Sequence, residues 1–298
     1  MERGKGQSEA AEEEVTPVFR RFAAIDWSGA KGKRHKGIAM AMCDAGGAAP
    51  ALVRPDLVWS RGEVLDWVVQ AAGEAPTLFG FDFSFVPPIA ARGEYLPGES
   101  GVPGEAKAFW AYVDDACDDD DLGAASFLET RHRSHFYFGA ADGVKRDFLH
   151  HRICEQAFNA TGGGKASTVY DAIGASQVAK ASFAGMRLLH ALGGRVPVWP
   201  MDEVPAQGSL VVEIYTRAFI RLAGLSGRKV RSVELLDLAL AALGSAPSAL
   251  ASKPSDHETD VLIAAAGLRA IAADPDWWAP AGLTPDVART EGWTFGVR

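Results

Sequence analysis

Two short apolar segments, each closing on an aspartate, constrain the fold of this chain most. Residues 19–26 (FRRFAAID) run directly into the turn sequence WSGAKGK, and residues 77–83 (TLFGFDF) are stopped by the prolines at 87–88. A continuous apolar run of strand length, bounded by Gly or Pro, is typical of a strand buried on both faces, as in the parallel part of an α/β sheet. We therefore predict an α/β fold with both segments inside its sheet.

The spacing of apolar residues predicts the other elements. Further strands are expected at 36–43, near 57–59, at 196–199 and at 209–215. Helices are expected at 62–72, near 176–192, from Ser232 to Gly244 and from Ser255 onward, where Ser255 and Glu258 form a capping box. Residues 92–165 show no sustained period, so we interpret them as an irregular insertion after the fourth strand. This order predicts a mixed sheet that begins as an antiparallel meander and continues with parallel crossovers.

Composition and charge place the chain among ordinary folded proteins. With 48% hydrophobic and 23% charged residues, we expect one domain over residues 18–290, preceded by a disordered acidic arm at 1–17. Three scattered cysteines without a C-x-x-C pair, and no apolar run of roughly 20 residues, favour a cytoplasmic protein. The net charge of −8 argues against a nucleic-acid coat protein, but an active site that binds cations is itself acidic.

Carboxylates stand where an α/β sheet positions ligand groups. Asp26 and Asp82 each lie at the downstream end of an apolar strand, and such ends can be adjacent. Asp256 and Asp260 are four residues apart on the last long helix and so share one face. Converging carboxylates repel one another unless they are neutralised, and hard oxygen ligands suit Mg²⁺ or Mn²⁺. Such ions activate a water in phosphodiester hydrolysis.

Structural interpretations compete with this one at several positions. An aspartate at a strand end is also a common turn former. Glu213, in the strand sequence VVEIY, is either a further site residue or the partner of Arg217 or Arg221. The helix dipole alone favours Asp256 in the first turn. We interpret His257 as an exposed first-turn residue in preference to a proton-transfer group.

Two other segments suggest ligands only weakly. The sequence GGGKAST at 162–168 departs from a phosphate loop, because Asn159 replaces the first Gly and Ala166 replaces the Ser or Thr that would bind Mg²⁺. We expect a flexible loop whose amides and Lys165 can touch a phosphate. The acid run DDACDDDD at 114–121 lacks the spaced ligands of an EF-hand and is expected to be a solvated loop.

Five blocks of the chain resemble a known family. FAAIDWSGAKG, LFGFDFSF, the helix ASQVAKASFAGMRLLHAL with PVWPMD, VVEIYTRAF and DHETDVLIAAAGLRA follow in order from about residue 19 to 274. Together they resemble the domain-of-unknown-function family 429, which is described as predicted RNase H-like nucleases. The last block is also similar to the end of RuvC-type resolvases, in which an acidic helix completes a metal site begun by the first strand.

The resemblance implies roles for the carboxylates. Asp26 would bridge two metal ions, Asp82 would hold one, and Asp260, with Asp256 beside it, would complete the set, while Glu213 would be a further ligand or an orienting residue. Asp82 departs from the resolvases, which typically have Glu there, and the insertion has no counterpart in them. We expect an RNase H-like fold on this basis.

The predicted activity is hydrolysis of DNA or RNA that depends on Mg²⁺ or Mn²⁺, with Lys31 and Arg217 near the substrate phosphate. One alternative is a phosphotransferase related to actin-like proteins and sugar kinases, because Asp26 is followed by Ser28 and Gly29. Another is an RNase H-like module that binds partners without catalysis. Nothing in the sequence indicates an oligomeric state.

Overall fold

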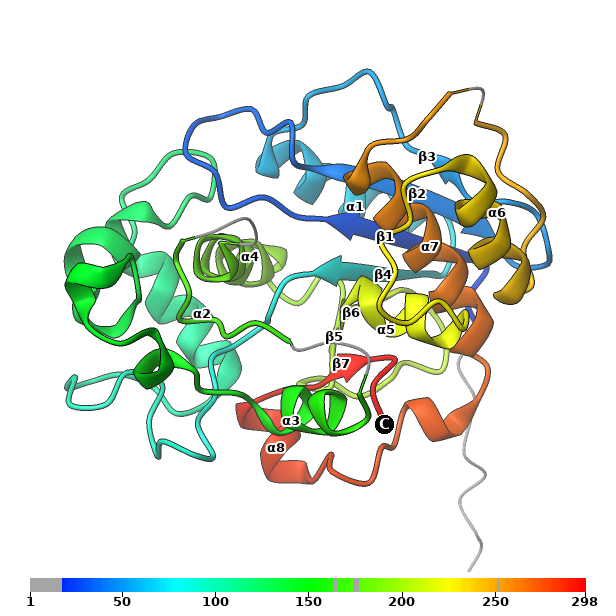
Figure 1. The fold of residues 1–298 in the computed structure, drawn as a ribbon. Coiled ribbons are helices and arrows are strands. Elements are labelled where there is room, and N and C mark those ends of the chain that lie inside the picture. The colour runs from blue at the N-terminus through cyan, green and yellow to red at the C-terminus, as the bar shows by residue number, and fades with distance from the viewer. Residues whose placement is uncertain (1–17, 163–165, 174–176, 251) are drawn as a thin grey trace, which may run out of the picture.

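The computed structural model describes residues 18–162, 166–173, 177–250 and 252–298, so the predicted arm at 1–17 lies outside the described residues. One mixed seven-stranded sheet runs through this part of the chain, in the order β3-β2-β1-β4-β6-β5 with β7 also paired to β6 (Figure 1). The strands are β1 (Arg21–Asp26), β2 (Ala39–Asp44), β3 (Ala51–Leu52), β4 (Thr77–Asp82), β5 (Val198–Trp199), β6 (Leu210–Ile214) and β7 (Thr294–Phe295).

The strand pairing changes once across the sheet, from antiparallel to parallel, as the sequence predicts. β1, β2 and β3 form an antiparallel meander. β4 then pairs with β1 in parallel, β6 with β4, and both β5 and β7 lie parallel along the free edge of β6. The predicted α/β class with a mixed sheet and an insertion after β4 is therefore confirmed.

Helices cover both faces of the sheet (Figure 1). The helices are α1 (Arg61–Glu74), α2 (Ala106–Asp115), α3 (Ile153–Ala160), α4 (Val178–Leu192), α5 (Thr216–Leu222), α6 (Val233–Ala242), α7 (Asp256–Ile271) and α8 (Pro285–Thr290). Side chains of α1, α2 and α4 pack with Ala23 and Ile25 in one core, and those of α5, α6 and α7 pack with Ala24 in another. Because alternate residues of β1 enter opposite cores, this strand is buried on both faces, as its continuous apolar run predicts.

Local signals in the sequence set the helix ends. At the start of α7, the Ser255 hydroxyl accepts a hydrogen bond from the Glu258 amide at 3.2 Å, and the Glu258 carboxylate accepts one from the Ser255 amide at 2.7 Å. The predicted capping box is thus confirmed. It fixes the first turn of α7, which carries Asp256 and His257.

Three expectations need correction. The third strand is β3, at Ala51–Leu52, whereas residues 57–59 contribute only an isolated bridge between Trp59 and His35. The insertion is not irregular throughout, because it contains α2 and α3. The acid run is not simply a solvated loop: Asp121 accepts hydrogen bonds from the first two amides of α1, each at 3.0 Å, and pairs with buried His35.

Three further observations bear on sequence-based expectations. The expected domain ended at residue 290, but β7 lies beyond that position and completes the edge of β6. No helix in the described part of the chain is long and apolar enough to cross a membrane. The three cysteines are free thiols. The cytoplasmic location stays a prediction.

Candidate carboxylate site

Three of the predicted site residues meet at one end of the sheet. Asp26 and Asp82 are the last residues of β1 and β4, and they are register partners across the parallel ladder. Asp260 lies in the second turn of α7, which packs on β1 and β2. All three side chains line the same hollow. The sequence positions each carboxylate at the end of a buried strand or early in a capped helix, and the parallel pairing of β1 with β4 makes the first two neighbours.

The pKa values of two of these carboxylates are raised, chiefly by burial and next by the charges of neighbouring aspartates. Burial, followed by the charges of Asp26 and Asp260, raises the pKa of Asp82 well above its ordinary value. Burial and the charges of Asp26 and Asp256 raise the pKa of Asp260 from 3.8 to about 7. The part of these shifts that comes from repulsion between carboxylates would be relieved by a bound cation.

Two polar partners orient the strand-end aspartates. The Thr216 hydroxyl donates a hydrogen bond to Asp82 at 3.0 Å. The Nδ1 atom of His257 pairs with the Asp26 carboxylate, and this hydrogen bond is the main cause that raises the pKa of His257. His257 is 51% exposed, as expected of a first-turn residue, but it also contacts a site residue. The Asp26 carboxylate is therefore fixed by a group that can exchange protons with solvent.

The donor chemistry fits a hard divalent cation, although the side chains do not form a closed coordination sphere. Within the described residues, no group of three or more His, Cys, Asp or Glu side chains is arranged to hold a metal ion. Mg²⁺ usually keeps several waters and binds through only one or two carboxylates. The adjacent pair Asp26 and Asp82 meets that smaller requirement, and every candidate ligand is an oxygen.

Glu213 is committed to contacts within the protein. Its buried carboxylate forms a two-pronged pair with the buried Arg152 guanidinium and accepts further hydrogen bonds from the Thr294 hydroxyl and the Phe85 amide, both at 2.7 Å. The sequence-based alternative, in which Glu213 pairs with Arg217 or Arg221, is therefore wrong: its partner is Arg152. Arg152 comes from the insertion, 61 residues away in the chain, and no local pattern could indicate this pair.

The other predicted residues lie in different surroundings. Asp256 is exposed and forms loose ion pairs with Lys229 at 3.8 Å and Arg231 at 3.7 Å. The Lys31 amine pairs with Glu129 at 2.6 Å, and Lys31 does not line either hollow at the carboxylates. Of the loop at 162–168, residues 163–165, including Lys165, lie outside the described residues, and Ser167 lines the larger hollow.

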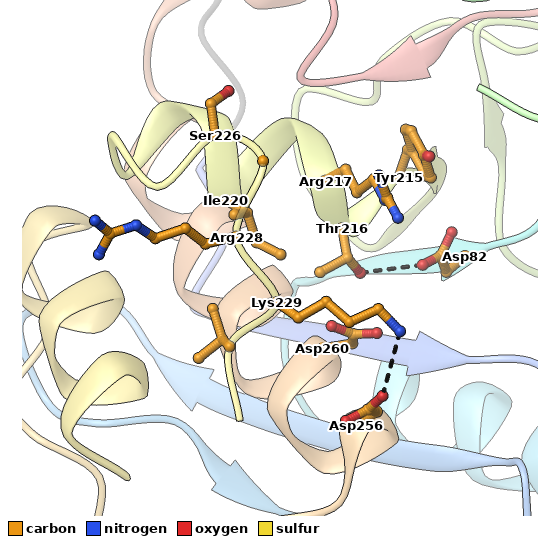
Figure 2. Close-up of a pocket in the computed structure, with 12 residues that line it drawn as sticks. Asp82, Tyr215, Thr216, Arg217, Ile220, Ser226, Arg228, Lys229, Asp256 and Asp260 are labelled. Atoms are coloured by element: carbon orange, nitrogen blue, oxygen red, sulfur yellow. Dashed lines mark hydrogen bonds and ion pairs between the residues drawn. The ribbon is translucent and has the colours of Figure 1, made fainter. Parts of the chain in front are cut away.

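Two hollows flank the carboxylates. The larger, of about 730 Å³, lies between the strand ends and the insertion, and its lining includes Phe158 and Ser167. The smaller, of about 220 Å³, lies between Asp82, Asp260 and the segment that follows α5 (Figure 2). Arg217 lines both, and Lys229, which our sequence analysis did not single out, lines the smaller. Asp82 and Asp260 thus line both hollows, whereas Asp26 lines only the larger.

Comparisons of the chain with models of protein families, with curated proteins and with solved structures found no match. The resemblance to family 429 therefore stays a prediction from the sequence blocks.

Proposed function

We propose that this chain is a nuclease with an RNase H-like fold, in which Asp26, Asp82 and Asp260 bind Mg²⁺ or Mn²⁺. The observation that carries the proposal is the register pairing of Asp26 with Asp82 at two parallel strand ends, beside a hollow that Asp260 also lines. The sheet order, antiparallel over three strands and then parallel, is consistent with RNase H-like topology. Nucleic acid as the substrate rests on the resemblance to family 429.

The protein residues have distinct parts in this proposal. When bound, the metal supplies a Lewis acid and a water of lowered pKa for attack on a phosphodiester. Asp26 and Asp82 provide adjacent oxygen ligands, and the Thr216 hydroxyl holds the second of them in orientation. His257 holds Asp26 and can carry protons between the site and solvent. Arg217, which lines both hollows, faces the phosphate.

The remaining predicted residues enter the proposal in supporting parts. Glu213 takes the orienting part, because its oxygens already accept bonds from Arg152, Thr294 and the Phe85 amide, and the last of these holds the chain just after Asp82. Asp256 is an outer carboxylate that adds negative charge near Asp260. Lys31 would reach a phosphate only after leaving Glu129.

The test is cleavage of nucleic acid by the purified chain with Mn²⁺, with Mg²⁺ or with a chelator, on single-stranded, double-stranded and branched DNA and on RNA. We expect cleavage only with a metal, and its loss in Asp26→Asn. The matched control is Asp44→Asn, because Asp44 also ends a strand but is 79% exposed at the opposite end of the sheet, near Arg21. This control should cleave like the unaltered protein.

Four outcomes would count against the nuclease. Failure to cut any substrate, or full cleavage by Asp26→Asn, would remove it. A rise in melting temperature with Mn²⁺ but no cleavage would favour the non-catalytic binding module, because a ligand of the native state raises stability without chemistry. Calorimetric binding of a nucleoside triphosphate would favour the phosphotransferase.

A further inference from the structure

The smaller hollow combines carboxylates with a concentration of positive charge. Arg217, Arg228 and Lys229 line it together with Asp82 and Asp260, in a chain whose net charge is −8 (Figure 2). Two of these cations are consecutive in the segment that joins α5 to α6, and Arg231 follows two residues later. Figure 2 shows Lys229 and Arg217 on the side of the carboxylates, whereas the Arg228 guanidinium is directed away from them.

Packing holds the segment in place. Leu225 and Val230 are buried in the core formed with α5, α6 and α7, so they anchor both sides of the basic residues. Between them, Gly227 has φ +75°, a conformation that glycine adopts without strain. The position of Lys229 beside the carboxylates is thus determined by buried neighbours and a turn.

Lys229 and Arg217 approach the carboxylates from different elements. Figure 2 shows the Lys229 side chain directed toward Asp256, with Asp260 beside it, while Arg217 projects from α5 near Asp82. The Lys229 amine is 3.8 Å from the Asp256 carboxylate and the lysine side chain is 64% exposed. Such an exposed ion pair contributes little to stability, so Lys229 can leave Asp256 at little cost.

A bound divalent cation would change the balance at this hollow. The metal ion neutralises the carboxylates that attract Lys229 and Arg217. It also repels these two side chains unless an anion binds between them and the metal. A volume of about 220 Å³ is below the roughly 300 to 1,000 Å³ of pockets that enclose a whole small molecule. The anion that fits best is a single phosphate group.

We propose that Arg217 and Lys229 form a phosphate-binding hollow for the backbone of a nucleic-acid strand next to the bond that is cleaved, with Arg228 at its rim. This rests on the proposed nuclease function, which names the strand as the substrate. Metal on the carboxylates and phosphate in the hollow then favour each other, because each compensates the charge of the other.

The experiment measures the binding of a short fluorescent single-stranded oligonucleotide by anisotropy, with Ca²⁺ as the cation, over a range of salt concentrations. In the double variant R228A/K229A we expect a dissociation constant about tenfold higher. The salt slope should be smaller by about 0.7, since the variant removes one phosphate contact, that of Lys229, and each contact contributes about 0.7 for a single strand. The variant Lys229→Arg should recover most of the contribution of Lys229.

The matched control is the double variant K33A/R289A. It also removes two exposed cations that form surface ion pairs, and neither residue lines a hollow at the carboxylates. We expect its affinity to stay within about twofold of the unaltered protein. In R228A/K229A the rise in melting temperature with Mn²⁺ should be at least as large as in the unaltered protein, because Lys229 no longer competes for Asp256.

An affinity and salt slope equal to those of the unaltered protein would overturn the proposal. So would the absence of any binding by the unaltered chain, or a loss of the Mn²⁺ effect in R228A/K229A, which would make the segment part of the metal site. Because binding is measured without hydrolysis, a chain that binds the strand through these cations but cuts no substrate would refute the nuclease and leave only the phosphate-binding hollow standing, with no cleaved bond beside it.

Discussion

Replacing Asp260 with Asn should stabilise the metal-free protein at neutral and alkaline pH. The pKa of Asp260 is raised from 3.8 to about 7 in the folded chain, mainly by burial and by the charge of Asp26. The unfolded chain therefore loses this proton first as the pH rises. The Asp260 carboxyl therefore lowers the free energy of unfolding. This loss of stability is absent below about pH 4, grows between about pH 4 and 7, and is complete above about pH 7.

The size of the effect follows from that interval. At about 1.36 kcal/mol for each pH unit, the difference between 3.8 and about 7 sets an upper bound of about 4 kcal/mol. Contact of the side chain with solvent and relaxation around it reduce this, so we expect about 1 to 2 kcal/mol at pH 8. The Asp260 carboxylate accepts no hydrogen bond from the described residues, in contrast to Asp82 and Asp26. Replacing it with the Asn side-chain amide therefore breaks no hydrogen bond.

The assay is urea unfolding at pH 5 and pH 8 in the presence of a chelator. Asp256→Asn is the matched control, because it makes the same change one helical turn earlier, at an exposed position. Loss of a first-turn charge should lower the stability of this control by about 0.3 to 1 kcal/mol. At pH 8 part of this loss is offset, because the Asp256 charge also repels Asp260. If Asp260→Asn does not gain stability at pH 8, or gains as much at pH 5, the electrostatic account of the site is wrong.

The remaining predictions concern packing, the buried ion pair and metal linkage. Arg152→Met should lower the free energy of unfolding by about 3 to 5 kcal/mol, measured by urea unfolding, because it leaves the Glu213 carboxylate buried and unpaired; R152M with E213Q should recover much of this, and additive losses would contradict the pairing. Gly185→Ala should destabilise α4, since an added Cβ would lie 2.3 Å from the Phe83 ring, whereas Gly73→Ala in α1 meets no atom within 4 Å and should be neutral or stabilising by up to about 1 kcal/mol; equal melting temperatures would refute this. The rise in melting temperature with Mn²⁺ should be larger at pH 8 than at pH 5.5, because at low pH the ion must displace protons from carboxyl groups whose pKa is raised; a pH-independent rise would argue against binding at these groups.

Sequence patterns were sufficient for the elements that have internal periodicity or a strong end signal. The apolar runs that end in Asp26 and Asp82 gave two central strands, and the capping box at Ser255 gave the start of α7. These are local features, so neighbouring residues determine them. The adjacency of Asp26 and Asp82 followed from one more rule, that parallel strands present the same ends at one edge.

Elements that depend on distant residues were beyond such patterns. β3 and β7 have two residues each, too few to show alternation. The pair of Arg152 with Glu213 joins residues 61 positions apart, and the contact of Lys31 with Glu129 joins residues 98 positions apart, so neither has a local signal. Asp121 belonged to a run of acids whose composition suggested solvation, but its caps on α1 are tertiary contacts.

The positive charge at the smaller hollow shows the same limit. Arg228 and Lys229 are unremarkable as a surface segment, since basic residues near Gly and Ser are common in loops. Only the fold brings Lys229 opposite Asp260. The sequence analysis did name Arg217 as a residue near the substrate phosphate, and in the structure Arg217 lines both hollows.

The most direct test of the metal site is a crystal structure of the chain soaked in Mn²⁺, with the ion located by its anomalous scattering. The account predicts an ion bound by oxygens of Asp26 and Asp82 at about 2.0 to 2.3 Å, with Asp260 as a direct or water-mediated ligand. An ion elsewhere, or no ion at the strand ends at a Mn²⁺ concentration that raises the melting temperature, would contradict it.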